Sequence, residues 1–179
     1  MVRRTAVALD LEGGARVGVS LESVFERSFA PLVRTLTIAA GDRQRAEDAV
    51  QDAFTQAYLH WPKVQHYGDP SAWLRRVATN RILNQHRSVL RRRTAVEALE
   101  AVPGSGVTVA PDTGVTARVD LAGAARRLPL QQRTAVALFN YADLPVSEVA
   151  DAMGLFDGTV RFHLHAARQA LKLALEVDP

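Results

Sequence analysis

Hydrophobic residues along most of this chain recur at the three- and four-residue spacing of α-helices. In the clearest stretch, residues 46–58, the apolar positions fall on a single stripe: Ala46, Ala49, Val50, Ala53, Phe54, Ala57 and Tyr58. A second stripe predicts a helix just upstream: Phe25, Phe29, Leu32, Val33 and Leu36. No segment shows a convincing strand alternation, so the pattern predicts an all-α fold.

The helical patterns fall into two groups, which predicts two small helical domains joined by a flexible linker. Residues 1–20 contain three glycines and lack a clear period, which predicts a flexible arm. Residues 21–93 form the first predicted helical domain. Residues 94–117 hold two prolines and three glycines and are the predicted linker, and residues 118–175 are helical again. We expect each domain to have its own core.

The second domain contains a predicted helix-turn-helix at 146–171, VSEVADAMGLFDGTVRFHLHAARQAL. Gly154 separates a short helix from a longer one, as in DNA-binding proteins of this type. The longer helix has a stripe of residues expected to be buried: Val160, Leu164, Ala167 and Leu171. At 100° per residue, Phe162 and His165 point away from that stripe.

The exposed face of this second helix carries side chains suited to the major groove. An Arg161 guanidinium matches guanine, and the edge of the Phe162 ring can pack on a thymine methyl. The alternative is that Phe162 packs against the linker or the other domain. His163 and His165 diverge on a helix, so we expect no metal site there.

Charge is concentrated in one part of the chain, at 75–93. This segment, RRVATNRILNQHRSVLRRR, holds seven arginines and no acid, while the whole chain has a net charge of +3, leaving +3 − 7 = −4 elsewhere. Such a patch is typical of a surface that binds a polyanion, most often nucleic acid. The alternative is a solvated helix face.

The segment between the first stripes and the basic helix is a predicted loop at 61–71. Pro62, Gly68 and Pro70 break helical periodicity, and either Asp69 or Ser71 is placed to cap the next helix. We expect Trp73 in the core. The loop contains Lys63, His66 and Tyr67, and we expect His66 and Tyr67 to be exposed.

Composition excludes several classes of protein. The chain of 179 residues has no cysteine, which excludes a disulfide framework, a thiolate zinc site and a cysteine nucleophile. There is no apolar run long enough for a membrane span and no signal-peptide pattern at the N-terminus, so we expect a cytoplasmic protein. No catalytic grouping stands out, and we expect neither an enzyme nor a cofactor.

Three motifs in this order resemble the extracytoplasmic-function (ECF) sigma factors of bacterial RNA polymerase, over roughly residues 21–175. GDRQRAEDAVQDAFTQAY resembles the segment that docks on the polymerase core. DPSAWLRRVATNRILNQHR resembles the segment that melts and reads the minus-ten promoter element. RLPLQQRTAVAL with SEVADAMGLFDGTVRFHLHAAR resembles the domain that binds the minus-thirty-five element.

The resemblance implies a role for each of three sets of residues. The core-polymerase set is Asp48, Gln51, Asp52 and Phe54. The minus-ten set, including the 61–70 loop where a flipped base would be held, is Lys63, His66, Tyr67, Arg76, Asn80 and Arg87. The minus-thirty-five set is Arg133, Thr159, Arg161, Phe162, His165 and Ala166. The family also implies an anti-sigma protein as a partner.

The chain departs from the family pattern at two helix N-caps. Pro145 and Phe156 stand where the family usually has a hydroxyl residue. Pro145 removes a capping box that Glu148 would otherwise complete, and Asp157 is expected to cap the recognition helix instead. The alternative function is a polymerase-independent helix-turn-helix regulator, which would leave the basic helix and the acidic face of 46–58 without a role.

Overall fold

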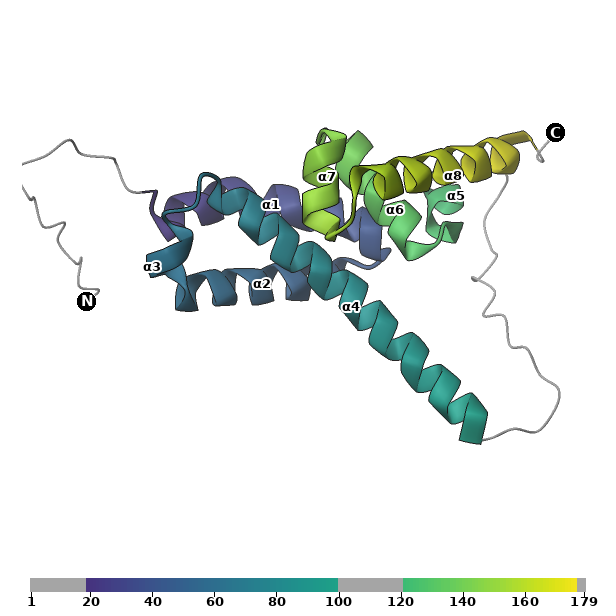
Figure 1. The fold of residues 1–179 in the computed structure, drawn as a ribbon, viewed down its shortest axis with the longest axis horizontal. Helices are drawn as coiled ribbons and strands as arrows, with labels where there is room; N and C mark the ends of the chain where they lie inside the picture. Colours follow the sequence, from purple (N-terminus) through teal and green to yellow (C-terminus); the bar gives the residue numbers. More distant parts are fainter. Residues whose placement is uncertain (1–18, 100–120, 177–179) are drawn as a thin grey trace, which may run out of the picture.

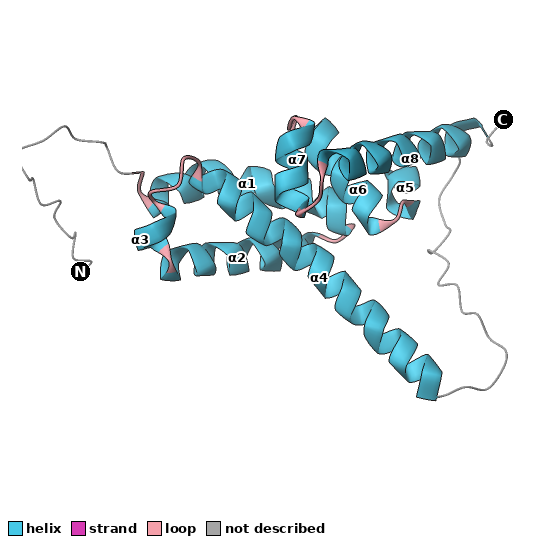
Figure 2. Ribbon diagram, in the orientation of Figure 1, coloured by secondary structure: helices cyan, strands magenta, loops and turns pink. Residues whose placement is uncertain are grey.

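A computed structural model of the protein describes residues 19–99 and 121–176, and these form helices joined by short turns. The first domain comprises α1 (Leu21–Ala40), α2 (Arg43–Leu59), α3 (Trp61–Val64) and α4 (Pro70–Leu99). The second comprises α5 (Leu121–Arg127), α6 (Leu130–Val136), η1 (Ala137–Tyr141), α7 (Val146–Met153) and α8 (Asp157–Glu176). The described residues contain no strand (Figures 1 and 2), so the predicted all-α class is confirmed.

Side chains next to the helix ends define α1 and α2. The Ser20 hydroxyl accepts a hydrogen bond from the Ser23 amide at 3.1 Å and caps α1. Gly41 ends α1 in the left-handed region, with φ of 73°, where a residue without a Cβ is favoured. Asp42 then caps α2 by accepting from the Arg45 amide at 3.1 Å.

The segment at 61–71 is more helical than the sequence predicted. Pro62 lies in the first turn of α3, and Pro70 is the first residue of α4. The prediction of a continuous loop was wrong here because the first turn of a helix needs no amide donor, so it accepts proline. Asp69, not Ser71, is the capping residue, because its carboxylate accepts from the Ser71 amide at 2.8 Å.

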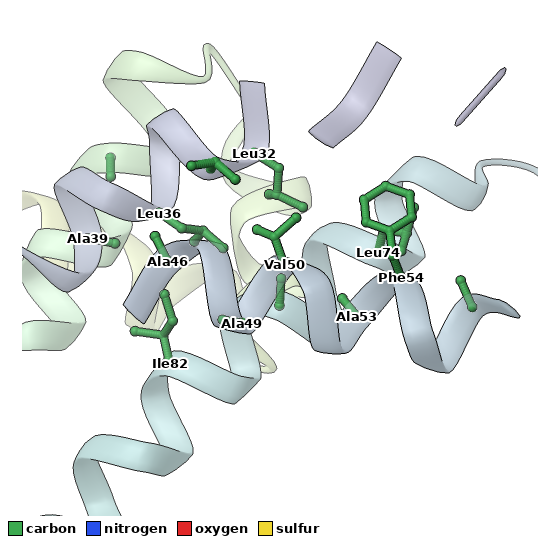
Figure 3. Packing of buried hydrophobic residues seen from close by; sticks show 14 of the residues in the cluster. Leu32, Leu36, Ala39, Ala46, Ala49, Val50, Ala53, Phe54, Leu74 and Ile82 are labelled. Carbon is green, nitrogen blue, oxygen red and sulfur yellow. The ribbon is translucent and has the colours of Figure 1, made fainter. Parts of the chain in front are cut away.

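The core of the first domain lies where α1, α2 and α4 meet (Figure 3). Leu36, Val50 and Leu74 are completely buried there. Phe54 is only 8% exposed, and its ring meets the Phe25 ring edge-on with centroids 5.0 Å apart. The predicted stripe of α2 is buried except for Tyr58, which lies in the last turn of α2 and is 72% exposed.

The second domain has the predicted helix-turn-helix. Gly154, with φ of 66°, ends α7, and the Leu155 amide donates to the Ala150 carbonyl at 2.9 Å across the turn. On α8, Val160 and Ala167 are buried and the two leucines of the predicted stripe are partly buried. The buried face of the recognition helix is therefore the one that the sequence predicted.

Neither helix of the helix-turn-helix is preceded by a residue whose side chain usually caps a helix: Pro145 precedes α7, and Phe156 precedes α8. Pro145 precedes α7 and makes no side-chain capping bond. Asp157 lies in the first turn of α8, and the Phe156 carbonyl accepts from the Thr159 and Val160 amides. The expectation that Asp157 caps α8 was wrong. Its negative charge in the first turn of α8 still interacts favourably with the positive end of the helix dipole.

Replacing Pro145 with serine is expected to make the protein more stable than replacing it with alanine, by about 1 kcal/mol. Serine supplies an oxygen that accepts from the α7 amides, which Pro145 does not cap at present. Urea denaturation followed by circular dichroism measures the difference. Comparison with Pro145→Ala removes the backbone effect of losing proline, and equal stability of the two variants would contradict the expectation.

The two domains pack against each other, which the sequence did not predict. Figure 1 shows α6 and α7 beside α1 and α4, and contacts join α1 to α6 and α4 to α7. Each domain keeps its own hydrophobic cluster, but Ala137 of the second domain joins the first cluster and Leu83 of the first joins the second. α4 also continues to Leu99, past the predicted domain boundary at 93.

Candidate nucleic-acid and polymerase interface

The exposed face of α2 presents the acidic and amide groups that the sequence placed there. Asp48, Gln51 and Asp52 are all exposed. The Asp48 carboxylate accepts from the Gln44 amide group at 3.0 Å, and Asp52 pairs with Arg81 of α4 at 2.8 Å. Phe54 instead lies in the core, so it holds α2 in place and does not form part of this face.

A cleft of about 570 Å³ runs between α2 and α4 and brings the predicted Arg76 and Asn80 together. Trp73 also lines it, together with Asp52 and Arg81. An indole surface beside amide and guanidinium donors matches the chemistry that holds an unpaired base, which stacks on aromatic rings and bonds through its edges. Trp73 is partly buried against the core, so its side chain serves both the core and the cleft.

The remaining predicted minus-ten residues are not part of this cleft. Lys63, in α3, is exposed, and His66 and Tyr67 are exposed on the turn that connects α3 to α4, as expected, but none of the three lines the cleft. The Arg87 side chain lies outside the described residues, although the backbone of α4 there is helical. The predicted exposure of His66 and Tyr67 is thus confirmed.

The outward face of α8 carries an exposed aromatic and basic surface. Arg161 and His165 are exposed, and Phe162 is 65% exposed, so the described residues do not bury its ring. Thr159 and Ala166 are partly buried beside them. The exposed Phe162 is the most informative of these, because a large apolar side chain left in water favours a partner surface.

His163 lies next to this face, and its partial burial favours the neutral imidazole. Burial lowers the pKa of the His163 imidazole, and its Nδ1 has no hydrogen-bond partner among the described residues. Its ring meets the Phe162 ring edge-on, with centroids 5.7 Å apart. His163 therefore adds shape but little positive charge to the recognition helix.

Arg133, predicted to grip a phosphate, faces the other domain in this structure. Its Nε donates to the Ala39 carbonyl at 2.6 Å, and its Nη2 donates to the Ala40 carbonyl at 3.3 Å. Burial, followed by the positive charges of Arg45 and Arg126, lowers the pKa of the guanidinium. Arginine stays charged at neutral pH in spite of such a shift, so this is a cation crowded by other cations.

Sequence reasoning missed the polar contacts between α4 and α7. Arg75 Nη2 lies 2.7 Å from Glu148 Oε2, and Asn80 Oδ1 lies 3.9 Å from the position that a Cβ on Gly154 would occupy. One sequence signal was available, because Pro145 leaves Glu148 without a capping-box partner. Nothing local to either helix pointed to Arg75 as the alternative.

No helix at 19–99 or 121–176 is long and apolar enough to cross a membrane. Over the same residues, no three or more potential metal ligands gather closely enough to hold an ion. The fold and these surfaces define a DNA-binding protein. Its second domain carries the helix-turn-helix, and its first domain is built around α4, a basic helix that lines a cleft with aromatic and polar side chains.

Comparison with known proteins identifies the family. The Sigma-70 region 2 family matches residues 26–93, and the Sigma-70, region 4 family matches residues 118–171. The ECF RNA polymerase sigma factor SigL of Mycobacterium tuberculosis is 30% identical over 87% of this chain and 89% of its own length. SigM of Bacillus subtilis is 25% identical over 86% of this chain and 94% of its own length. The chain belongs to the ECF sigma factors.

Two solved structures have the same fold. The sigma factor RpoE, solved in complex with the anti-sigma factor NepR from Bartonella quintana, has a TM-score of 0.64 and 23% identity, covering 88% of this chain and 98% of its own. CnrH, solved with the cytosolic domain of CnrY, has a TM-score of 0.57 and 21% identity, covering 89% of each chain. The protein is thus a sigma factor that directs RNA polymerase to promoters, and the polymerase-independent regulator is not favoured.

Proposed function

We propose that the three surfaces divide the work of a promoter-specificity subunit: α2 docks on the polymerase core, the α2–α4 cleft holds the minus-ten strand, and α8 reads the minus-thirty-five element. The observation that carries this proposal is the cleft itself. It joins the docking helix to the basic helix and gathers aromatic, amide and guanidinium groups in one place. A regulator that bound only duplex DNA would have no use for it.

The acidic face of α2 is the proposed docking surface for the core enzyme. Asp48, Gln51 and Asp52 lie off the apolar stripe and are exposed, so their side chains are available to a partner without loss of the fold. Carboxylates on a rigid helix favour a basic partner surface, which raises the association rate and sets the register of docking. Phe54 is proposed to act indirectly, by fixing α2 against α1.

The minus-ten strand is proposed to lie along Arg76 and Asn80, with one base in the cleft beside Trp73. An amide can recognise a base edge through paired hydrogen bonds, and a guanidinium can contact a base or a phosphate. Lys63 of α3, with His66 and Tyr67 of the turn that follows it, is proposed to contact the same strand. The basic stretch of α4, including Arg87, continues the positive charge along the strand's path.

Arg161→Ala is expected to cost about 1–3 kcal/mol on the best promoter and to relax its preference at one position, as for a bidentate arginine–guanine contact. Phe162→Ala is expected to weaken promoters in which a thymine methyl meets the ring. Neither change touches the buried stripe of α8. The measurement is selection from a promoter library by reconstituted holoenzyme, comparing each variant with wild type.

Two matched variants separate reading of the sequence from general attraction. Arg168→Ala removes an exposed arginine further along α8 and is expected to leave the selected sequences unchanged. Arg133→Ala, proposed to remove a phosphate contact in the holoenzyme, is expected to weaken all promoters evenly and to flatten the salt dependence. Identical selected sequences for wild type, Arg161→Ala and Phe162→Ala would show that this face does not read DNA.

An anti-sigma protein is the proposed regulatory partner. Two proteins that share this fold support this: RpoE was solved in complex with the anti-sigma factor NepR from Bartonella quintana, and CnrH was solved in complex with the cytosolic domain of CnrY. The protein is proposed to act in the cytoplasm, where its polymerase and promoter DNA are found, and to catalyse no reaction itself. Co-purification of the tagged protein from its own host, followed by mass spectrometry, tests this partner directly.

The proposed function is tested by reconstitution with purified core polymerase. The tagged protein is expected to retain core polymerase in a pull-down and to support run-off transcription from promoters selected by the holoenzyme. Core polymerase alone on the same templates is the control. Binding of the isolated protein to duplex DNA without any association with core would instead support the regulator.

A further inference from the structure

Phe156 is the most exposed large apolar side chain in the part of the chain that the structure describes, with 87% of its surface open to water. It lies in the turn of the helix-turn-helix, directly before α8, which begins at Asp157. A single exposed apolar side chain is common on protein surfaces and needs no special explanation. Phe156 differs because it stands at the end of the helix by which helix-turn-helix proteins contact DNA.

The backbone on both sides of Phe156 is held by hydrogen bonds. Before it, the Leu155 amide donates to the Ala150 carbonyl at 2.9 Å, and after it the Phe156 carbonyl accepts from the Thr159 amide at 2.9 Å and the Val160 amide at 3.1 Å. Val160 is completely buried, so the turn is anchored in the core of the domain. A phenyl ring has only two rotatable bonds, so ordering it against a partner costs little conformational entropy. The turn therefore presents a preorganised apolar surface.

Asp157, the next residue, shares one face of α8 with Arg161. The two are four positions apart on the helix, and both are exposed. Their spacing suits an ion pair, but the ion pairs of the described residues do not include one between them. The Asp157 carboxylate is therefore available to a partner. DNA phosphates repel a carboxylate, whereas the N4 amino group of cytosine donates to one in the major groove, so Asp157 suits a base edge better than the DNA backbone.

The N-terminal end of α8 has room for DNA to approach closely. Gly158 is exposed and has no side chain, and a Cβ there would meet no atom within 4 Å. In helix-turn-helix proteins the N-terminal residues of the recognition helix contact the base edges. The proposed minus-thirty-five surface of α8 begins at Thr159, so Phe156 and Asp157 extend it, without a gap, toward the end that reaches the bases.

We propose that Phe156 and Asp157 form a second base-reading element of the protein, in which the Phe156 ring packs on the C5 methyl group of a thymine and the Asp157 carboxylate accepts from the N4 amino group of a cytosine. The proposal rests on the proposed function of α8, because this helix must lie in the major groove for either side chain to reach a base. It adds two base preferences to those of the face formed by Arg161, Phe162 and His165.

Selection from a promoter library by reconstituted holoenzyme tests both residues. Phe156→Ala is expected to lose a thymine preference at one position. Asp157→Asn keeps the size of the side chain but pairs with adenine, so it is expected to change one preferred cytosine to adenine, with a change in preference of about tenfold. Leu173→Ala is the matched control, because it removes an apolar side chain that is 61% exposed near the other end of α8, and it should select the wild-type sequences. Unchanged sequences for Phe156→Ala or for Asp157→Asn would overturn the proposal.

Removing a single methyl group from the DNA tests the contact of Phe156 from the other side. Each thymine of the selected minus-thirty-five element is replaced in turn by deoxyuridine, which lacks only the C5 methyl. We expect one replacement to weaken binding of wild-type holoenzyme about fourfold, as for the loss of one buried methyl group. That effect should vanish in Phe156→Ala and persist in Phe162→Ala, which separates the two rings. If no methyl effect depends on Phe156, the ring does not read thymine.

The same selections distinguish failure of this proposal from failure of the proposed function. If Arg161→Ala changes the selected sequences but Phe156→Ala does not, α8 reads DNA and the second element is overturned. If neither variant changes them, the proposed function of α8 fails as well. Weaker binding of Phe156→Ala to polymerase core, with unchanged selected sequences, would place the ring against the polymerase and overturn the proposal. Phe156 is almost fully exposed, so native circular dichroism is expected for its variant.

Discussion

Replacing both Asp48 and Asp52 with arginine is expected to abolish binding to polymerase core, with a loss of affinity on the order of a hundredfold or more. Each change turns a carboxylate that favours a basic partner into a charge that repels it, and two such repulsions in one interface cost several kcal/mol. Both residues are exposed, so the free energy of unfolding should fall by less than about 1 kcal/mol. Titration of labelled core polymerase measures the affinity.

The matched control for this pair is Glu22→Arg with Glu26→Arg. It makes the same change of net charge at two exposed acids of α1 and is expected to bind core normally. A second control is needed because Asp52 also pairs with Arg81. Arg81→Ala removes that pair and leaves the acidic face intact, so it should retain core binding. Unchanged affinity of the Asp48, Asp52 double variant, with native circular dichroism, would reject the docking role.

Leu36→Ala is expected to lower the free energy of unfolding by about 2–5 kcal/mol. Leu36 is completely buried where α1 meets α2 and α4 (Figure 3), so the substitution removes apolar contacts and leaves a cavity. Because small proteins are stable by only about 5–15 kcal/mol, this is a large share of the total. Urea denaturation monitored by circular dichroism measures it.

Leu59→Ala is the matched control, because it makes the same chemical change at a position that is 62% exposed. It is expected to change the free energy of unfolding by no more than about 0.5 kcal/mol. Equal losses for the two leucines would contradict the placement of Leu36 at the centre of the core. The comparison also shows how much of the first domain's stability depends on the meeting of α1, α2 and α4.

The sequence by itself determined the helices and the helix-turn-helix, because these depend on residues close together in the chain. The stripe from Ala46 to Ala57 and the buried positions of α8 follow from helical periodicity alone. Gly154 acts within its own turn, so its role could also be predicted from the sequence. The prediction from local sequence failed at Pro62 and Pro70, because proline is accepted in the first turn of a helix although it interrupts the interior of one.

Only the tertiary structure decided which side chains face a partner and which face the other domain. Arg133 reaches a carbonyl 94 positions away in the chain, and Arg75 pairs with a residue 73 positions away. No periodic pattern encodes such contacts, because they depend on how two separate helical surfaces fit together. Phe54 is similar: its identity was compatible with a docking face or a core, and its packing against Phe25 placed it in the core.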